Sequence, residues 1–388
     1  MRVALNLEQL LLRPPGGIGR YTSELARLLP GPDPDGGERI EVVPFVARHR
    51  QTQVEAGLGA FGLADLEPVR LWLPRPVLYD TWNLFGSPRL DRLHRELRGV
   101  DIVHAPSLAV PPRVRGAALV VTAHDAATLV FPDAYPLRGR WFHRRGLAAT
   151  ARRADLVITP TRAAADEITA RTNISEDRIR IVPHGVVQRR VSEGLITAAR
   201  ANIGLGDEPY VLWVGTLEPR KNLPLLLEAY QAVVRAGLPE RLVIVGPPGW
   251  RGGPQAVHAA ATALGDRVVF AGSLRSDRLV ALYRGATLFA FPSLHEGFGL
   301  PVLEAMVQEA PVVCSDIPVL REIAGDAARY APPDDAGVWA DTLVELLRDE
   351  PARRALGALG RERARGFTWE RCIRRTRALY REVLSESS

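Results

Sequence analysis

Cysteine is almost absent from this 388-residue sequence, which contains only Cys314 and Cys372. The first lies in an apolar run that is typical of a strand, and the second lies in a charged segment that is typical of a helix. This usage supports neither a disulfide framework nor a thiolate metal site, and it fits a reducing cytoplasm.

Long hydrophobic runs are missing too. The apolar stretch near the N-terminus is too short and too interrupted for a signal peptide, and no later run approaches membrane-spanning length. The sequence also lacks low-complexity segments and blocks of one charge sign, while 46% of its residues are hydrophobic and 24% are charged. These values predict a compact globular protein whose length gives room for two domains.

The net charge of +6 comes mainly from arginine. Such an excess indicates either anionic partners or simply the base composition of the genome, and we favour the second explanation. Because the basic residues are scattered and no recognition module is evident, we expect no nucleic-acid partner. One denser basic and aromatic cluster, residues 138–153, is interpreted either as a solvated helix face or as a helix at an anionic membrane surface.

Residues 291–306, FPSLHEGFGLPVLEAM, have the pattern of a strand, a glycine loop and a helix. An apolar run ends at the loop, and Pro301 is suited to the first position of a helix that continues over residues 302–309. The N–H groups of residues 297–300 would then face an anion. Glu296 and Glu304 bracket the loop, where both carboxylates could bind sugar hydroxyls, although a glutamate early in a helix often only complements the helix dipole.

The second half of the chain alternates short apolar runs with amphipathic segments, which predicts parallel strands covered by helices on both faces. Strands are expected at 210–214, 241–245, 268–271, 288–291 and 312–314. Arg220 and Lys221 follow the first of these strands. Such cations are either exposed loop residues or ligands for phosphate oxygens.

The first half predicts a similar α/β arrangement. A strand at 3–6 precedes a glycine-containing loop and a helix from about Arg20 to Leu29, and further strands are expected at 40–46, 100–104, 119–123, 154–160 and 178–183. Little else can be placed in the proline- and glycine-rich residues 31–99. His124 follows a strand, at the sheet edge where open α/β folds bind ligands, although a lone histidine there is more often a loop hydrogen-bonder.

Six segments in order along the chain resemble the retaining GT-B glycosyltransferases of family 4, closest to the O-antigen type mannosyltransferase-like branch. The segments are GGIGRYTSEL, VTAHD, VPHGV, VGTLEPRKN, FPSLHEGFGLPVLEAM and FTWE. This resemblance implies a GT-B fold of two Rossmann-like doubly wound domains facing across a cleft. It implies an N-terminal acceptor domain at 1–187, a donor domain at 188–368, and a C-terminal helix at 369–388 that returns to the N-terminal domain, anchored by Trp369.

The resemblance also assigns roles to residues. It implies catalytic roles for His124, Arg220, Lys221 and Glu296, with His124 reaching a hydroxyl of the donor sugar and the two cations holding the diphosphate. Glu304 matches the glutamate that binds the ribose hydroxyls. The donor-binding set that it implies is Gly16, Gly17, Gly215, Gly246, Leu274, Arg275, Gly297, Phe298, Gly299, Leu300 and Glu304. His184 is either a departure from the family or a tolerated variant. The sequence also has His295 in place of a tyrosine and differs from the family over 307–313, and neither of these two changes removes a group that the chemistry needs.

The function implied is that of a retaining hexosyltransferase, with GDP-mannose as the expected donor and a saccharide or lipid-linked saccharide as the acceptor. No Asp-x-Asp motif follows a strand, so we expect no metal and no other cofactor. We expect the protein in the cytoplasm, with possible peripheral contact with an anionic membrane. A GT-B nucleotide-sugar 2-epimerase that acts on the donor alone remains the alternative.

Overall fold

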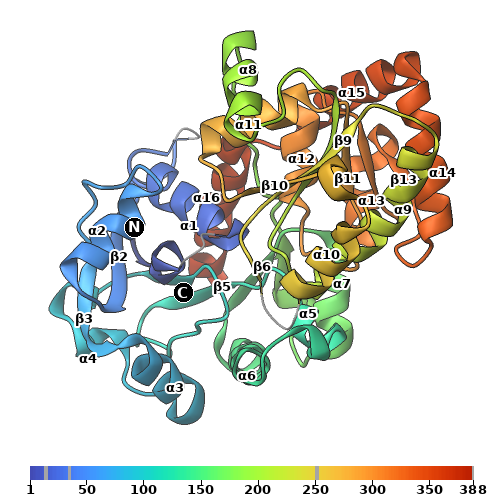
Figure 1. Cartoon of the computed structure of the whole chain (residues 1–388). Coiled ribbons are helices and arrows are strands. Elements are labelled where there is room, and N and C mark those ends of the chain that lie inside the picture. The colour runs from blue at the N-terminus through green and yellow to red at the C-terminus, as the bar shows by residue number, and fades with distance from the viewer. Residues whose placement is uncertain (13–15, 34–35, 250–252, 387–388) are drawn as a thin grey trace. The chain divides into compact units, whose positions relative to one another are not determined.

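The computed structural model describes residues 1–12, 16–33, 36–249 and 253–386, and its chain divides into two compact units. Unit 1 comprises Met1–Val130, Leu137–Gly185 and Trp369–Ser388, and unit 2 comprises Phe131–Pro136 and Val186–Thr368. Each unit is built around a parallel sheet with helices packed on it (Figure 1).

The sheet of unit 1 has seven parallel strands in the order β3-β2-β1-β4-β5-β6-β7. In chain order they are β1 (Arg2–Asn6), β2 (Glu41–Arg48), β3 (Val69–Pro74), β4 (Ile102–Ala105), β5 (Ala118–Thr122), β6 (Leu156–Thr159) and β7 (Ile179–Ile181). The order reverses between β1 and β4, which is the switch point at which doubly wound sheets bind ligands. Most of these strands are short apolar runs, as expected for a sheet that is covered on both faces.

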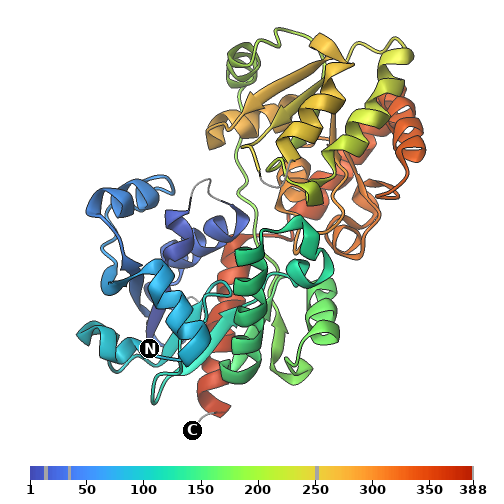
Figure 2. The ribbon, with the colours of Figure 1, turned by 60° about the horizontal axis from the view of Figure 1, so that its bottom comes forward.

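The helices of unit 1 include one from the far end of the sequence. They are α1 (Gly17–Leu28), α2 (Gln51–Gly59), α3 (Arg75–Phe85), α4 (Leu90–Leu93), α5 (Ala127–Val130), α6 (Leu137–Arg153), α7 (Arg162–Arg171) and α16 (Trp369–Glu386). Helix α16, in red, lies beside α1 (Figures 1 and 2). The predicted return of the C-terminal helix to the N-terminal domain is therefore confirmed.

A buried row of hydrogen bonds attaches α16 to the sheet. The Tyr380 hydroxyl lies 2.6 Å from Nδ1 of His104, and Nε2 of the same ring lies 2.8 Å from the Thr122 hydroxyl. Thr122 in turn lies 3.0 Å from the hydroxyl of Tyr21 on α1. Trp369 is buried in the same region, with its ring stacked at 5.9 Å on that of His184. Polar groups as well as apolar side chains thus fix the helix in unit 1.

Unit 2 repeats the same topology in a six-stranded parallel sheet, in the order β10-β9-β8-β11-β12-β13. Its strands are β8 (Tyr210–Val214), β9 (Arg241–Val245), β10 (Val268–Gly272), β11 (Leu288–Phe291), β12 (Val312–Ser315) and β13 (Arg329–Ala331). The switch point here lies between β8 and β11, so the loops after these two strands meet at one edge.

The helices of unit 2 cover this sheet with their apolar faces. They are α8 (Glu193–Asn202), α9 (Leu223–Arg235), α10 (Gly253–Thr262), α11 (Ser276–Gly285), α12 (Leu300–Val307), α13 (Pro318–Ala324), α14 (Ala336–Arg348) and α15 (Glu350–Ala364). Trp213 and Trp339 are fully buried in its core. The two Rossmann-like units together confirm the predicted GT-B fold class.

Several elements differ from the sequence-based expectation. β3 and β13 were not predicted, and residues 31–99, where one strand was expected, also contain α2, α3 and α4. Helix α12 starts at Leu300, one residue before the predicted start at Pro301, because Gly299 provides the left-handed residue (φ 91°) that ends the loop. The helix ends at Val307 rather than at Glu309, which itself has a positive φ of 61°.

Candidate active site

Two cations and a carboxylate meet at the switch point of unit 2. Arg220 and Lys221 lie on a short 3₁₀ helix, η5 (Pro219–Lys221), that follows β8, and Glu296 lies in the loop between β11 and α12. Because β8 and β11 are parallel neighbours, their carboxyl ends bring these loops together. Lys221 and Glu296, which are 75 positions apart in the sequence, thereby meet in one cluster.

The central contact of this cluster is a buried ion pair. Nζ of Lys221 lies 2.5 Å from Oε1 of Glu296, and the side chains are only 10% and 9% exposed. The Ser293 hydroxyl donates to the same carboxylate oxygen at 2.6 Å. The Lys221 ammonium also lies 4.9 Å from the centre of the Phe291 ring, a favourable position over an aromatic face. The side chains are therefore held rigidly before any ligand arrives.

Arg220 is fixed from three sides. Its Nη2 lies 2.6 Å from Oε1 of Glu218, its Nη1 lies 3.4 Å from Oε2 of Glu296, and the same Nη1 donates to the His295 carbonyl at 2.5 Å. The Arg220 carbonyl accepts from the N–H of Leu294 at 2.9 Å. The loop after β8 and the loop after β11 are thus bonded to each other through both side chains and backbone.

The charges of the cluster set its protonation. Burial by itself would raise the pKa of the Glu296 carboxyl, but Lys221, Arg220 and the Ser293 hydroxyl together lower that pKa to about 2. Burial lowers the pKa of Lys221, and the neighbouring carboxylate opposes this shift. At neutral pH, Glu296 is therefore an anion between two cations, and a second carboxyl group, that of Glu218, lies 2.6 Å from Arg220.

Glycines at the carboxyl ends of three neighbouring strands, β8, β9 and β10, pack against one another in unit 2. Gly246 follows β9 with φ 150°, and a Cβ there would lie 1.7 Å from the Gly215 carbonyl oxygen. The Gly246 N–H donates to the Gly272 carbonyl at 2.9 Å. The predicted donor-binding glycines Gly215 and Gly246 are therefore in direct contact, and any side chain at residue 246 would collide with the Gly215 backbone. Of the predicted base-binding residues, Leu274 is half-buried and Arg275 is exposed.

The loop before α12 is buried, and Gly297, Phe298 and Gly299 all belong to it. A Cβ on Gly299 would lie 2.8 Å from Cδ2 of Leu320. Leu300 is the first residue of α12, where N–H groups have no partner within the helix. Glu304 is half-buried on α12, and Oε2 of its carboxylate accepts from the Tyr283 hydroxyl at 3.1 Å.

The remaining predicted residues belong to unit 1. Gly16 caps α1 and Gly17 is its first residue. His124 follows β5, with its ring 5.3 Å from that of Tyr21 on α1. Nε2 of His124 lies 2.9 Å from the Pro106 carbonyl, and its Nδ1 lies 3.1 Å from Nε2 of His184.

This geometry fixes the neutral tautomers of both rings. The Pro106 carbonyl can only accept, so Nε2 of His124 carries the proton, Nδ1 accepts, and Nε2 of His184 donates to it. Burial lowers the pKa of both histidines. Both ring nitrogens of His124 already have partners inside unit 1, so a sugar hydroxyl that bonds to this ring must replace one of them.

Sequence reasoning did not single out Glu218, Ser293, Tyr283 or His184 as parts of the two clusters. Glu218 and Ser293 lie inside the quoted motifs, so proximity to predicted site residues was a usable signal for them. Nothing in the sequence placed Tyr283 next to Glu304. Their contact depends on how α11 and α12 pack, which motif spacing does not encode.

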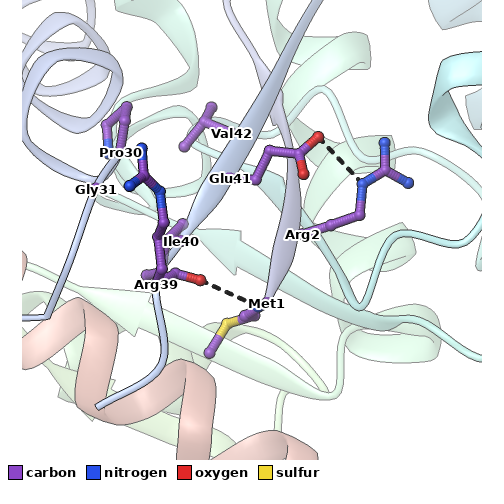
Figure 3. Close-up of a pocket in the computed structure, with 8 residues that line it drawn as sticks. All are labelled: Met1, Arg2, Pro30, Gly31, Arg39, Ile40, Glu41 and Val42. Carbon is purple, nitrogen blue, oxygen red and sulfur yellow. Dashed lines mark hydrogen bonds and ion pairs between the residues drawn. The ribbon is translucent and has the colours of Figure 1, made fainter. Parts of the chain in front are cut away.

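Two kinds of site are absent from the part of the chain that the structure describes, and a hollow there lies away from the predicted site residues. No group of three or more histidine, cysteine or acidic side chains there could hold a metal ion. Among the described segments, no helix is long and apolar enough to cross a membrane. A hollow in unit 1 lies at the amino ends of β1 and β2, away from their carboxyl ends, and contains no predicted site residue (Figure 3). Its lining residues are Met1, Arg2, Pro30, Gly31, Arg39, Ile40, Glu41 and Val42.

Comparison with known proteins covers both units. Residues 15–190 match the family model described as Glycosyltransferase Family 4, and residues 196–363 match the model described as Glycosyl transferases group 1. The O-antigen chain mannosyltransferase B of Escherichia coli is 29% identical over 374 residues, covering 94% of this chain and 96% of that protein. A D-inositol 3-phosphate glycosyltransferase of Saccharomonospora viridis is 32% identical over 286 residues, covering 70% of this chain and 66% of that protein.

Solved structures agree on the fold. The HepE protein of Anabaena, solved in complex with UDP-glucose, superposes with a TM-score of 0.75 at 18% identity, with both chains fully covered. At that identity the likeness speaks for the fold alone. Taken with the two family models and the mannosyltransferase relative, it places this chain among the GT-B glycosyltransferases of family 4, as a mannosyltransferase-like enzyme.

Proposed function

We propose that this protein transfers mannose from GDP-mannose to a hydroxyl of a saccharide acceptor in polysaccharide or glycolipid synthesis, with retention of the anomeric configuration. The observation that carries the proposal is the buried cluster of Arg220, Lys221 and Glu296 at the switch point of unit 2. The choice of mannose is supported by the similarity to an O-antigen chain mannosyltransferase over nearly the whole chain.

The cluster suits the charge that develops during transfer. As the bond between the sugar C1 and the phosphate oxygen breaks, its electron pair goes to the diphosphate and positive charge grows on the sugar ring. Lys221, Arg220 and the first turn of α12 at Leu300 would stabilise the leaving diphosphate. Glu296, held as an anion by its neighbours, would face the reacting sugar.

Retention follows if the acceptor attacks from the face that the diphosphate leaves. The acceptor oxygen bonds to C1 on that face, and its proton passes to the departing phosphate oxygen, so no enzyme nucleophile is needed. His124 would meet a sugar hydroxyl by exchanging its Nδ1 bond to His184 for one to the sugar. Because Arg220 and Lys221 supply the positive charge at the phosphates, we propose that the transfer needs no metal ion.

The remaining donor contacts are assigned by position. Glu304 would bind the ribose hydroxyls, and Leu274 and Arg275 would contact the base. The glycine positions would contact the donor through their backbone. A Cβ at Gly16 would meet open space, whereas Cβ atoms at Gly246 and Gly299 would meet Gly215 and Leu320, so these two glycines keep the loops closely packed. The full set of glycines comprises Gly16, Gly17, Gly215, Gly246, Gly297 and Gly299, with Phe298 between the last two.

Product analysis tests the proposal directly. Incubation with GDP-mannose and an oligomannoside acceptor should release GDP and give an α-linked mannoside, identified by its anomeric NMR signals. Lys221→Ala should form both products roughly 10²- to 10³-fold more slowly. A β-linked product would refute retention. An isomerised donor formed without acceptor would instead favour the 2-epimerase, which none of the observations above supports.

We also propose that unit 1 contacts an anionic membrane that carries the acceptor. The support is a surface on which α3 and α6 lie side by side (Figure 1), joined by an ion pair of 3.3 Å between Arg138 and Asp80. The outer face of α3 is apolar, with Phe85 76% exposed. Helix α6 adds an exposed basic face that includes Arg144 and Arg145. Apolar and basic groups together are what an interfacial helix pair needs.

Part of the basic run 138–153 does not belong to this surface. Leu147 is buried, Phe142 packs on Tyr79 at 6.0 Å, and Arg153 donates to the carbonyl of Trp82 at 2.8 Å. Sedimentation with vesicles of one-third anionic lipid in low salt should carry down the enzyme, and Arg144→Glu with Arg145→Glu should prevent this. Equal sedimentation with neutral vesicles, or an unaffected double variant, would remove the membrane proposal.

A further inference from the structure

Tyr283 is a buried side chain whose polar end meets a residue of the proposed donor site. It lies on α11 and is 1% exposed, and its ring packs at 63° against that of Phe289 on β11, with centroids 5.4 Å apart. Its hydroxyl lies 3.1 Å from Oε2 of Glu304 on α12. A rigid aromatic side chain in the core thus ends at a carboxylate that is only half-buried.

The mobility of the two partners differs. A glutamate has three side-chain torsions, and a half-exposed one on a helix would sample several rotamers. A tyrosine has two, and here packing on Phe289 fixes its ring. The bond between them therefore restricts Glu304 much more than it restricts Tyr283.

The bond uses only part of the carboxylate. An ionised carboxylate accepts at about four lone-pair positions on its two oxygens, and a phenol donates only one hydrogen. Tyr283 can therefore hold one oxygen of Glu304 while the carboxylate still accepts from a ligand. Two hydroxyls on neighbouring carbons present two donors at the spacing of a carboxylate, so a vicinal diol suits a carboxylate held in one orientation.

We propose that Tyr283 is a positioning residue that orients the Glu304 carboxylate toward the vicinal diol of the donor's ribose. This inference rests on the proposed function, since it requires a nucleotide-sugar donor. The cost of ordering Glu304 is met in the folded protein rather than on binding, so the bond strengthens donor binding. Because the ribose takes no part in bond breaking, the effect is equal in the ground state and the transition state.

The test is Tyr283→Phe, which keeps the ring and removes only the hydroxyl. We expect the donor KM to rise by roughly 3- to 10-fold with kcat within about twofold of the parent, since uniform binding is lost. The matched control is Tyr210→Phe. Tyr210 is equally buried in unit 2, but its hydroxyl donates to the Leu282 carbonyl at 2.7 Å, so this change should leave the donor KM unaltered.

A second measurement separates positioning from general loosening. The 2′-deoxy analogue of GDP-mannose should bind the parent enzyme less tightly than GDP-mannose itself. The ratio of the two dissociation constants, analogue over GDP-mannose, should be smaller in Tyr283→Phe than in the parent. Because the ratio compares two ligands on the same preparation, it does not depend on how much of the variant is folded. In Glu304→Ala the two donors should bind equally well, because the carboxylate that distinguishes them is gone.

Several outcomes overturn the proposal. An unchanged KM in Tyr283→Phe, an unchanged ratio between the two donors, or an equal KM rise in Tyr210→Phe would show that the hydroxyl only joins α11 to α12. In all of these the parent enzyme still uses the donor, so the proposed function survives. If the parent binds neither GDP-mannose nor any other nucleotide sugar, the proposed function itself fails and this inference falls with it.

Discussion

At the scale of single residues, the Lys221–Glu296 ion pair is central to the chemistry proposed for unit 2. Both side chains are almost fully buried, and removing two charges from water is costly unless each has close partners. Ser293 and Arg220 are partners of Glu296, and Glu218 in turn pairs with Arg220. This cluster is held in place before a ligand binds, and Arg220 and Lys221 are the cations in it that would face an anion.

The first residue-scale prediction separates catalytic from binding roles. Lys221→Ala and Glu296→Ala should each lower kcat by roughly 10²- to 10³-fold, since these groups are proposed to act on charge that develops in the transition state. Glu304→Ala should mainly raise the donor KM, by about tenfold. Steady-state kinetics with varied donor measures both effects. Arg329→Ala, which breaks an exposed ion pair with Glu345, serves as the control and should change neither value.

A reversed pattern would require new assignments. If Glu304→Ala abolished turnover at saturating donor while Glu296→Ala changed only KM, the positions of sugar and ribose along the loop would have to be exchanged.

The variant that lacks both Lys221 and Glu296 should have a kcat only a little lower than that of either single variant, because each change already disrupts the same pair.

The second residue-scale prediction concerns stability and pH. The folded-state pKa of Glu296 is lowered to about 2 from an ordinary value of 4.5, so folding favours the ionised carboxylate. Its contribution is complete above pH 4.5 and is lost as the pH falls toward 2. Glu296→Gln should therefore be less stable than the parent by a few kcal/mol at pH 7, on the order expected for breaking a buried pair.

The measurement is thermal unfolding at several pH values. The difference in Tm between the parent and Glu296→Gln should narrow steadily from pH 5 to pH 3. A difference that stays constant over this range would mean that the Glu296 carboxylate is not stabilised by its cationic neighbours.

At the scale of elements, α16 shows how a buried polar row can fix a helix. The His104 ring bonds to Tyr380 on α16 and to Thr122 on β5, and burial lowers its pKa to about 3. Unfolding returns the ring to its ordinary pKa of 6.5. The unfolded chain therefore binds one more proton at acid pH, and the stability of unit 1 should fall as the pH drops from 6.5 toward 3.

The prediction at this scale is that Tyr380→Phe destabilises unit 1 by about 1–3 kcal/mol, because it leaves a buried ring nitrogen without its partner. Urea unfolding, followed by the near-ultraviolet signal, would measure it. Ser385→Ala is the control on the same helix, since the Ser385 hydroxyl makes only an exposed local bond to the Glu382 carbonyl. Equal stability of Tyr380→Phe and the parent would show that apolar packing alone holds α16.

Prediction from sequence succeeded where elements are short, apolar and buried. β8, β9 and β11 were predicted at their observed bounds, because a parallel strand covered on both faces is a continuous apolar run between glycine- or proline-containing loops. β3 was missed because it is an edge strand with exposed residues such as Trp72, so its pattern is mixed. Residues 75–93 were missed because helices α3 and α4 lie within a proline- and arginine-rich segment.

At the scale of the whole molecule, two doubly wound units share one topology but differ in the side chains at the carboxyl edges of their sheets. Unit 2 has charged side chains at that edge, and unit 1 has a neutral histidine pair next to Tyr21. The motifs predicted which residues gather in each unit, since loops after parallel neighbouring strands must meet. The motifs could not predict the residues that bond to the predicted site residues, such as Tyr283 to Glu304 and His184 to His124, because these contacts depend on helix packing and ring orientation.

The last prediction treats the molecule as a ligand-binding whole. A donor that binds only the folded protein stabilises it by RT ln(1 + [L]/Kd), about 2.7 kcal/mol at a hundredfold excess over Kd, which corresponds to several degrees in Tm. We expect GDP-mannose to raise Tm more than UDP-glucose or UDP-N-acetylglucosamine, because the mannosyltransferase relative matches nearly the whole chain. The increase should be the same in EDTA and in magnesium, since Arg220 and Lys221 are proposed to hold the diphosphate. A larger increase from either UDP sugar would refute the proposed donor, and an increase that requires magnesium would refute metal independence while leaving the transferase assignment intact.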